Sequence, residues 1–193
     1  AMRGREIVED VLRERGWENV GYRLEPRPGG EQLLFMSGTD ALGLGAIQAG
    51  CRFYAGYPIT PASPLLAFMD RHLYTYGGRS LQGQNERESI RAALGASLAG
   101  ARAMVGSSGP GISLKVEEFG LAATAEIPIV VVDSQRAGPS TGMPTKTEQG
   151  DLRMTIGAGH GDIPRIVLAP STLEECYALI LEDTSLAQGD YAR

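Results

Sequence analysis

The chain has 193 residues, 42% hydrophobic and 21% charged, which is typical of a soluble globular protein large enough for one buried core. Its formal net charge of −5 disfavours a nucleic-acid partner, and no apolar run approaches the roughly 20 residues of a membrane-spanning helix. Because the first residues also lack the apolar stretch of a secretory signal, we expect a cytoplasmic protein that binds neither nucleic acid nor membrane.

Strand-like and helical patterns alternate along the chain from residue 33 onward. The expected elements are, in order, a strand at 33–36, a helix over 41–50 capped by Asp40, strands at 53–56 and up to Gln82 with a helix over 62–74 between them, a helix over 86–100, a strand at 103–106, a helix over 112–124, strands at 127–133 and 166–168, and a helix over 172–186. The apolar run at 127–133 is typical of a strand buried on both faces of a parallel sheet. The alternation predicts an α/β fold, with an open, mostly parallel sheet and helices on both faces.

The first 32 residues have a different character. A charged amphipathic helix is expected at 6–15, and the Pro/Gly-rich stretch at 23–30 is typical of a linker. We therefore predict an N-terminal appendage or linker at 1–32 and an α/β domain at 33–193.

Cysteine and histidine are scarce and widely spaced. Cys51 and Cys176 cannot form a C-x-x-C pair, and His72 and His160 have no third ligand at an obvious spacing. We expect two unpaired cysteines and no metal ion held by this chain.

Three loops between predicted strands and helices have an unusual composition that a loop serving only as a connection does not need. They are the turn at 57–61, the Gly/Pro turn at 107–111 and the polar loop that begins at 134. Each follows a predicted strand, and ligands of open α/β sheets bind at the carboxyl ends of the strands. The sequence therefore predicts a binding site at this edge of the sheet.

Two short motifs suggest other functions. Gly138, Ser140 and Gly142 fit the G-x-S-x-G nucleophile elbow of hydrolases, but Pro144 stands where the helix after the serine should begin. The glycines of the 106–111 turn, with Asp133 at the end of the next strand, suggest a dinucleotide site. Their spacing is reversed relative to G-x-G-x-x-G, and Pro110 lacks an N–H to face a phosphate. Dinucleotide binding remains an alternative.

Glu86 opens the strongest helical pattern of the chain. Taken alone, a first-turn glutamate is most often an exposed residue whose negative charge the helix dipole stabilises. Small residues and Gly95 follow it at turn spacing, which would let this helix pack closely against a neighbour.

Several segments together resemble one family in order and spacing. They are GYPITPAS (56–63), Glu86, GASLAGARA (95–103), SSGPGISL (107–114), SQRAGPSTGMPT (134–145) and EQGDL (148–152). The chain resembles the α subunit of 2-oxoacid:ferredoxin oxidoreductases, most nearly the 2-oxoglutarate type, over residues ~33 to ~180. In that family this region binds the aminopyrimidine ring of thiamine diphosphate.

The resemblance implies a role for individual residues. Glu86 matches the glutamate that hydrogen-bonds N1′ of the aminopyrimidine, and Thr60 matches a threonine close to the cofactor and the 2-oxoacid. Arg136 matches the arginine that binds the substrate carboxylate, for which a guanidinium fork is suited. Further residues are expected to line the same cleft: Tyr57, Pro58, Ser108, Gly109 and Pro110 for the cofactor, and Ser140 and Thr141 for the substrate.

The resemblance also implies partners. A separate β subunit would carry the diphosphate, Mg²⁺ and a [4Fe–4S] cluster, coenzyme A would take the acyl group, and ferredoxin would take the electrons. The chain would be active only when paired. Two positions depart from the family pattern, Gln84–Asn85 in place of an acidic pair and Lys115 in place of an apolar residue. A non-catalytic binding or assembly module on the same fold is the second alternative.

Overall fold

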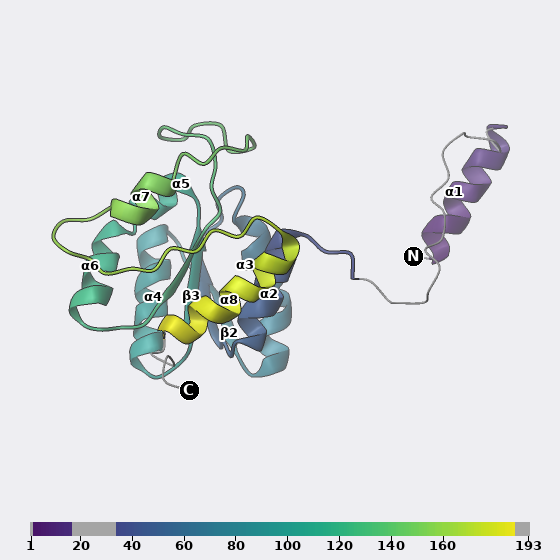
Figure 1. Ribbon diagram of the computed structural model, residues 1–193. Coiled ribbons are helices and arrows are strands. Elements are labelled where there is room, and N and C mark those ends of the chain that lie inside the picture. Colours follow the sequence, from purple (N-terminus) through teal and green to yellow (C-terminus); the bar gives the residue numbers. More distant parts are fainter. Residues whose placement is uncertain (1, 17–33, 188–193) are drawn as a thin grey trace. The chain divides into compact units, whose positions relative to one another are not determined.

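The structure is a computed structural model that describes residues 2–16 and 34–187 (Figure 1). The chain forms two compact units, residues 1–35 and 36–193. In the first unit, helix α1 (Met2–Glu14) contains most of the helix predicted at 6–15. The predicted linker at 23–30 and the predicted boundary after residue 32 lie outside the described residues.

The second unit is built on a four-stranded parallel sheet. Its strands are β1 (Phe53–Gly56), β2 (Arg79–Gln82), β3 (Ala103–Ser107) and β4 (Val130–Asp133). They lie in the order β2-β1-β3-β4, so Tyr54 of β1 is paired with Ser80 on one side and with Met104 on the other. The predicted α/β fold with a parallel sheet is confirmed.

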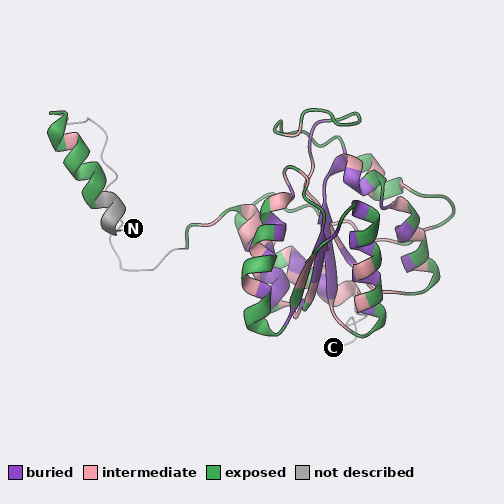
Figure 2. Ribbon diagram, turned by 180° about the vertical axis from the view of Figure 1, so that it is seen from behind, coloured by how far each residue is buried: buried purple, intermediate pink, exposed green. Residues whose placement is uncertain are grey.

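Helices cover both faces of this sheet because its strands alternate their side chains between two apolar clusters. Tyr54 and Met104 pack with α2 (Gly38–Gln48), α3 (Ser63–His72), the 3₁₀ helix η1 (Leu73–Tyr76) and α8 (Leu173–Ala187). Ala55 and Val105 point the other way, toward α4 (Glu86–Leu98) and α6 (Val116–Thr124). Figure 2 shows the buried strands in the centre, with the buried sides of the helices turned toward them.

Local capping sets where two of these helices begin. Ser37, not Asp40, is the N-cap of α2, and the two residues form a reciprocal capping box. The helix therefore begins before the predicted start at residue 41. Asn85 caps α4 by accepting a hydrogen bond of 2.9 Å from the Glu88 N–H, which fixes Glu86 as the first helical residue.

Some predicted elements differ from the structure. The helix expected over 112–124 is two helices, α5 (Gly109–Ser113) and α6, and α7 (Leu152–Gly157) was not predicted. Residues 34–36 and 166–168 are not strands, and within the described residues neither segment makes ladder hydrogen bonds. β4 is therefore the outer strand of the described sheet, and only its first residue, Val130, is buried. Val130 and Val132 pack into one apolar cluster and Val131 into the other, so both faces of β4 are covered as predicted, although only Val130 is fully buried.

No helix in the described ranges is long and apolar enough to cross a membrane.

Candidate functional site

The candidate site lies where the four parallel strands end. β1 leads into the turn at 57–61, β2 into the start of α4, β3 into α5, and β4 into the long loop that precedes α7. Figure 1 shows this loop and α5 at the same end of the sheet. Parallel strands point the same way, so their connections gather at one edge, as the sequence predicted.

Glu86 is the first residue of α4, and only 8% of its surface is exposed. It lies against Gly111 of α5: a Cβ built on Gly111 would come within 3.2 Å of the Glu86 Oε1 atom and would overlap the Ser107 hydroxyl. Because glycine has no Cβ, Gly111 leaves room for this carboxylate. Glu86 is thus buried, and the exposed first-turn glutamate that such a position usually holds is excluded.

A buried lysine lies near Glu86. Lys115 is fully buried, and its Nζ atom has no hydrogen-bond partner in the described part of the chain. Burial lowers the pKa of Lys115 to about 8, although the carboxylates of Glu86 and Glu118 act to raise it. Two hydroxyls at the start of α5, those of Ser107 and Ser108, are also buried without a partner. The site is therefore a polar interior whose groups are not all satisfied by the chain itself.

Arg136 joins two of the loops. Its guanidinium donates to the carbonyl of Thr60 at 2.8 Å and to the carbonyl of Thr141 at 2.9 Å, and only 5% of the residue is exposed. Its Nε atom is buried and has no partner in the described structure. Arg136 therefore braces the turn after β1 against the loop after β4, and Nε is left available for another acceptor.

Asp151 is a residue that the sequence analysis did not single out. Its Oδ2 atom accepts the Gly109 N–H at 3.1 Å and the Arg136 N–H at 3.3 Å. It thereby ties the start of α5 to the loop that carries Arg136. Asp151 lies inside the EQGDL segment, so the motif was visible, but its spacing gave no sign of these distant partners.

The remaining predicted site residues are distributed over the same edge. Tyr57, Pro58 and Thr60 are exposed in the turn after β1, and Ser140 and Thr141 are exposed in the loop after β4. Ser108 and Gly109 are buried at the start of α5, while Pro110 is half-buried. The structure thus brings Thr60 and Thr141 together through Arg136, and it brings Gly111 to Glu86.

The two alternative motifs do not have the geometry that their chemistry needs. Ser140 lies in an exposed loop with a φ of 57°, and no helix begins after it, so there is no nucleophile elbow. Asp133 accepts a hydrogen bond of 2.9 Å from Thr155, and burial raises its pKa to about 6. The Gly109 N–H, which a dinucleotide phosphate would need, already donates to Asp151 at 3.1 Å.

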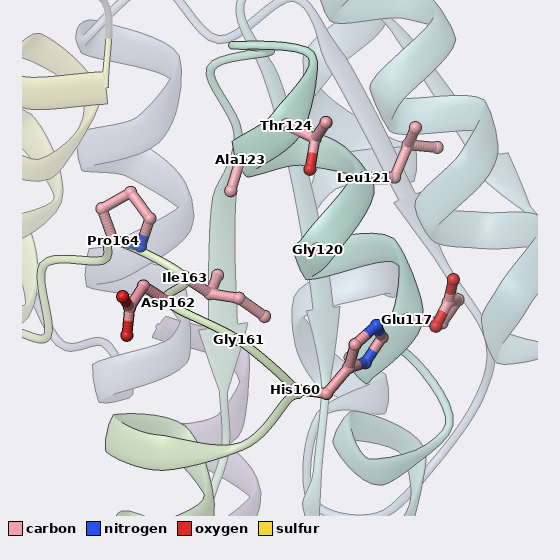
Figure 3. A pocket seen from close by; sticks show the side chains of 10 residues that line it. All are labelled: Glu117, Gly120, Leu121, Ala123, Thr124, His160, Gly161, Asp162, Ile163 and Pro164. Atoms are coloured by element: carbon pink, nitrogen blue, oxygen red, sulfur yellow. The ribbon is translucent and has the colours of Figure 1, made fainter.

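A separate pocket of about 470 Å³ lies between α6 and residues 160–164. In Figure 3 its walls carry Leu121 and Glu117 from the helix and His160 and Ile163 from the facing segment. None of the residues predicted for the cofactor or the substrate lines it. In the described residues, no three His, Cys, Asp or Glu side chains are grouped so that they could hold a metal ion.

The open parallel α/β sheet with its unusual loops at one edge is the fold of a ligand-binding domain, and the family match identifies its class. Residues 44–191 match the family described as pyruvate flavodoxin/ferredoxin oxidoreductase, thiamine diphosphate-binding, and the chain belongs to this family.

Particular relatives agree with this family. The chain is 50% identical over 146 residues to the 2-oxoglutarate synthase subunit KorA of Methanocaldococcus jannaschii, covering 76% of this chain and 40% of that protein. It is 44% identical over 153 residues to the ketoisovalerate oxidoreductase subunit VorB of Methanothermobacter thermautotrophicus, covering 79% of this chain and 43% of that protein.

A solved structure is similar as well. It is a 2-oxoglutarate:ferredoxin oxidoreductase from Magnetococcus marinus with 2-oxoglutarate, coenzyme A and succinyl-CoA bound. The TM-score is 0.77 and the identity 47%, over 79% of this chain and 27% of that one. The chain thus spans less than half the length of the relatives it matches.

Proposed function

We propose that this chain is the aminopyrimidine-binding part of an α subunit of a 2-oxoacid:ferredoxin oxidoreductase. The enzyme would oxidatively decarboxylate a 2-oxoacid, with 2-oxoglutarate as the first candidate, to an acyl-CoA and would reduce ferredoxin. The observation that carries the proposal is the buried Glu86 carboxylate at the start of α4, held against Gly111 at the strand ends.

The residues present fit thiamine diphosphate. Within the described residues the Glu86 carboxylate accepts no hydrogen bond from the chain, although it is almost completely buried. A ring nitrogen carrying a proton would donate to this carboxylate and replace its small remaining contact with solvent. The turn at 108–110 and the exposed Tyr57 and Pro58 would flank the ring.

Each of these residues would have a defined task. When bound, the cofactor supplies the electron sink that decarboxylation of a 2-oxoacid needs. Glu86 would hold and exchange a proton at N1′ of the aminopyrimidine, which a buried carboxylate can do without competition from water. Arg136 would present its unpartnered Nε–H to the substrate carboxylate, and Thr60, tied to Arg136 through its carbonyl, would lie beside it.

The other half of the active site would come from a partner. We propose a β subunit that holds the diphosphate, Mg²⁺ and a [4Fe–4S] cluster, with ferredoxin and coenzyme A as the further reactants. The proposal is supported by the family to which the chain belongs and by the bound coenzyme A and succinyl-CoA of the similar oxidoreductase.

Substitution of Glu86 tests this function. In the full-length subunit assembled with its partner, we expect Glu86→Gln to abolish exchange of the cofactor's C2 proton, measured by proton NMR after quenching in D₂O. Glu117→Gln is the matched control, because Glu117 is an exposed glutamate in the first turn of α6. Unchanged exchange in Glu86→Gln would refute the assignment.

Substrate choice is tested by steady-state rates with 2-oxoglutarate and with 2-oxoisovalerate. The relatives include subunits named for each type of substrate. A higher kcat/KM for 2-oxoglutarate supports the proposed substrate, and a higher value for the branched acid rejects it.

A further inference from the structure

Lys115 has no task in the proposed function. It is fully buried at the start of α6, and its Nζ atom has no hydrogen-bond partner among the described residues. An ammonium removed from water without partners destabilises a fold, so a buried cation usually balances a nearby anion or serves the site.

Charges of alternating sign surround Lys115. Glu86 and Arg91 belong to α4, and Lys115 and Glu118 to the facing α6, so the cluster is neutral when all four groups are ionised. Arg91 already pairs with Glu118: its Nε and Nη2 atoms lie 2.9 and 2.8 Å from Glu118 Oε1. Arg91 thus balances one oxygen of Glu118, while Glu118 Oε2 is buried without a partner in the described structure. Both carboxylates act on Lys115, and Glu86 has the larger effect.

A short turn joins Lys115 to the residue that contacts Glu86. Gly111 of α5, against which the Glu86 carboxylate packs, lies four residues before Lys115, which is the N-cap of α6. The Lys115 N–H donates to the Ile112 carbonyl at 2.9 Å and closes this turn. Removal of Lys115 would leave an uncompensated negative charge in this buried cluster.

We propose that Lys115 is a positioning residue for Glu86, whose ionised form its ammonium stabilises. The proposal rests on the function proposed above: a proton shared between Glu86 and a bound ring nitrogen would then lie on the nitrogen. Burial lowers the pKa of Lys115, and Glu86 is the stronger of the two carboxylates that act to raise it, which is the direction that this pairing requires.

The pairing can be measured without cofactor. The sequence contains two lysines, Lys115 and the exposed Lys146, so ¹³C-labelled lysine gives two assignable NMR titrations in this chain. We expect Lys115 to titrate with a pKa of about 8 and Glu86→Gln to lower that pKa further. Glu117→Gln, on the solvent side of α6, should leave it in place. An unchanged Lys115 titration in Glu86→Gln would overturn the proposal.

The catalytic consequence is measured in the assembled enzyme. Lys115→Met keeps a long unbranched side chain but leaves the buried negative charge uncompensated, so we expect a lower thermal midpoint than that of the wild type. We expect kcat and C2-proton exchange to fall about tenfold, with KM for the 2-oxoacid unchanged. Lys115→Arg, which keeps the positive charge, should recover part of the loss.

The outcomes separate the two proposals. If Lys115→Met lowers the thermal midpoint but leaves proton exchange unchanged, Lys115 is only structural and the positioning role is overturned. If Glu86→Gln shifts the Lys115 titration but the assembled wild-type enzyme exchanges no C2 proton, the pairing stands and the proposed function fails.

Discussion

Gly111→Ala places a methyl group between α5 and the Glu86 carboxylate. Two effects of opposite sign act on stability. Alanine is favoured over glycine inside a helix by about 1 kcal/mol. The new Cβ would lie 3.1 Å from Glu86 Cγ and would overlap Ser107 Oγ, in a place where Ser107 is fully buried.

The steric effect is expected to win. Overpacking of a closed interior costs about 1–3 kcal/mol, and the buried Ser107 hydroxyl has little space to rotate away. At the middle of that range the net loss is about 1 kcal/mol, which corresponds to a fall in Tm of roughly 2–4 °C for a domain of this size. Displacement of Glu86 should also reduce C2-proton exchange in the assembled enzyme.

Gly95→Ala is the matched control for this prediction. Gly95 lies inside α4, but a Cβ there would meet no atom within 4 Å, so only the propensity gain of about 1 kcal/mol remains. Urea unfolding monitored by circular dichroism should give a higher midpoint for Gly95→Ala and a lower one for Gly111→Ala, with equal slopes. Equal stabilisation by both substitutions would refute the tight contact between Gly111 and Glu86.

Three further predictions concern the loop edge. Because the pKa of Asp133 is raised to about 6, the stability that this group contributes is complete below its unfolded value of 3.8 and is lost as the pH rises through 6. The side chain of Asp133→Asn can still accept from Thr155, so we expect its free energy of unfolding to exceed that of the wild type by about 2–3 kcal/mol at pH 7 and to equal it at pH 3.5. An equal gain at both pH values in urea unfolding would contradict this. Gly142 has a φ of 57°, and a Cβ there would overlap the Ala137 carbonyl oxygen, so Gly142→Ala should open the loop to proteases. Gly138→Ala is the control and should not, because a Cβ on Gly138 would meet no atom within 4 Å. Arg136→Lys should lose at least one of the two hydrogen bonds to the Thr60 and Thr141 carbonyls, which should lower the free energy of unfolding by about 1–3 kcal/mol in the same assay. An unchanged midpoint would show that Arg136 does not hold the two loops together.

Local patterns in the sequence were sufficient for the architecture. The predicted bounds of β1 agree with the structure, and the alternation of strands and helices correctly indicated a parallel sheet. The same reasoning placed the three unusual loops at one edge, because parallel strands share a direction. It was less accurate where capping or edge position decides the outcome, as at Ser37, the N-cap of α2, and along the outer strand β4, whose residues after Val130 are only partly buried.

Close packing by small residues was inferred for the wrong glycine. Gly95 was expected to allow a near approach to a neighbouring helix, but the space around it is open. Gly111 makes the close approach instead, and it was seen only as part of a turn. Helical spacing indicates which residues share a face, but it does not indicate what lies opposite that face.

By itself, the sequence determined the family, the sheet and the position of Glu86 at the start of a helix. Only the tertiary structure decided that this carboxylate is buried against Gly111, that Lys115 lies unpartnered in the same interior, and that Arg136 is held by the Thr60 and Thr141 carbonyls. The physical reason is the separation along the sequence of the residues that interact. Periodicity and capping depend on neighbours within a few residues, whereas the hydrogen bond from Arg136 to Thr60 joins residues 76 apart in the chain. Such contacts exist only after the strands have brought their ends together.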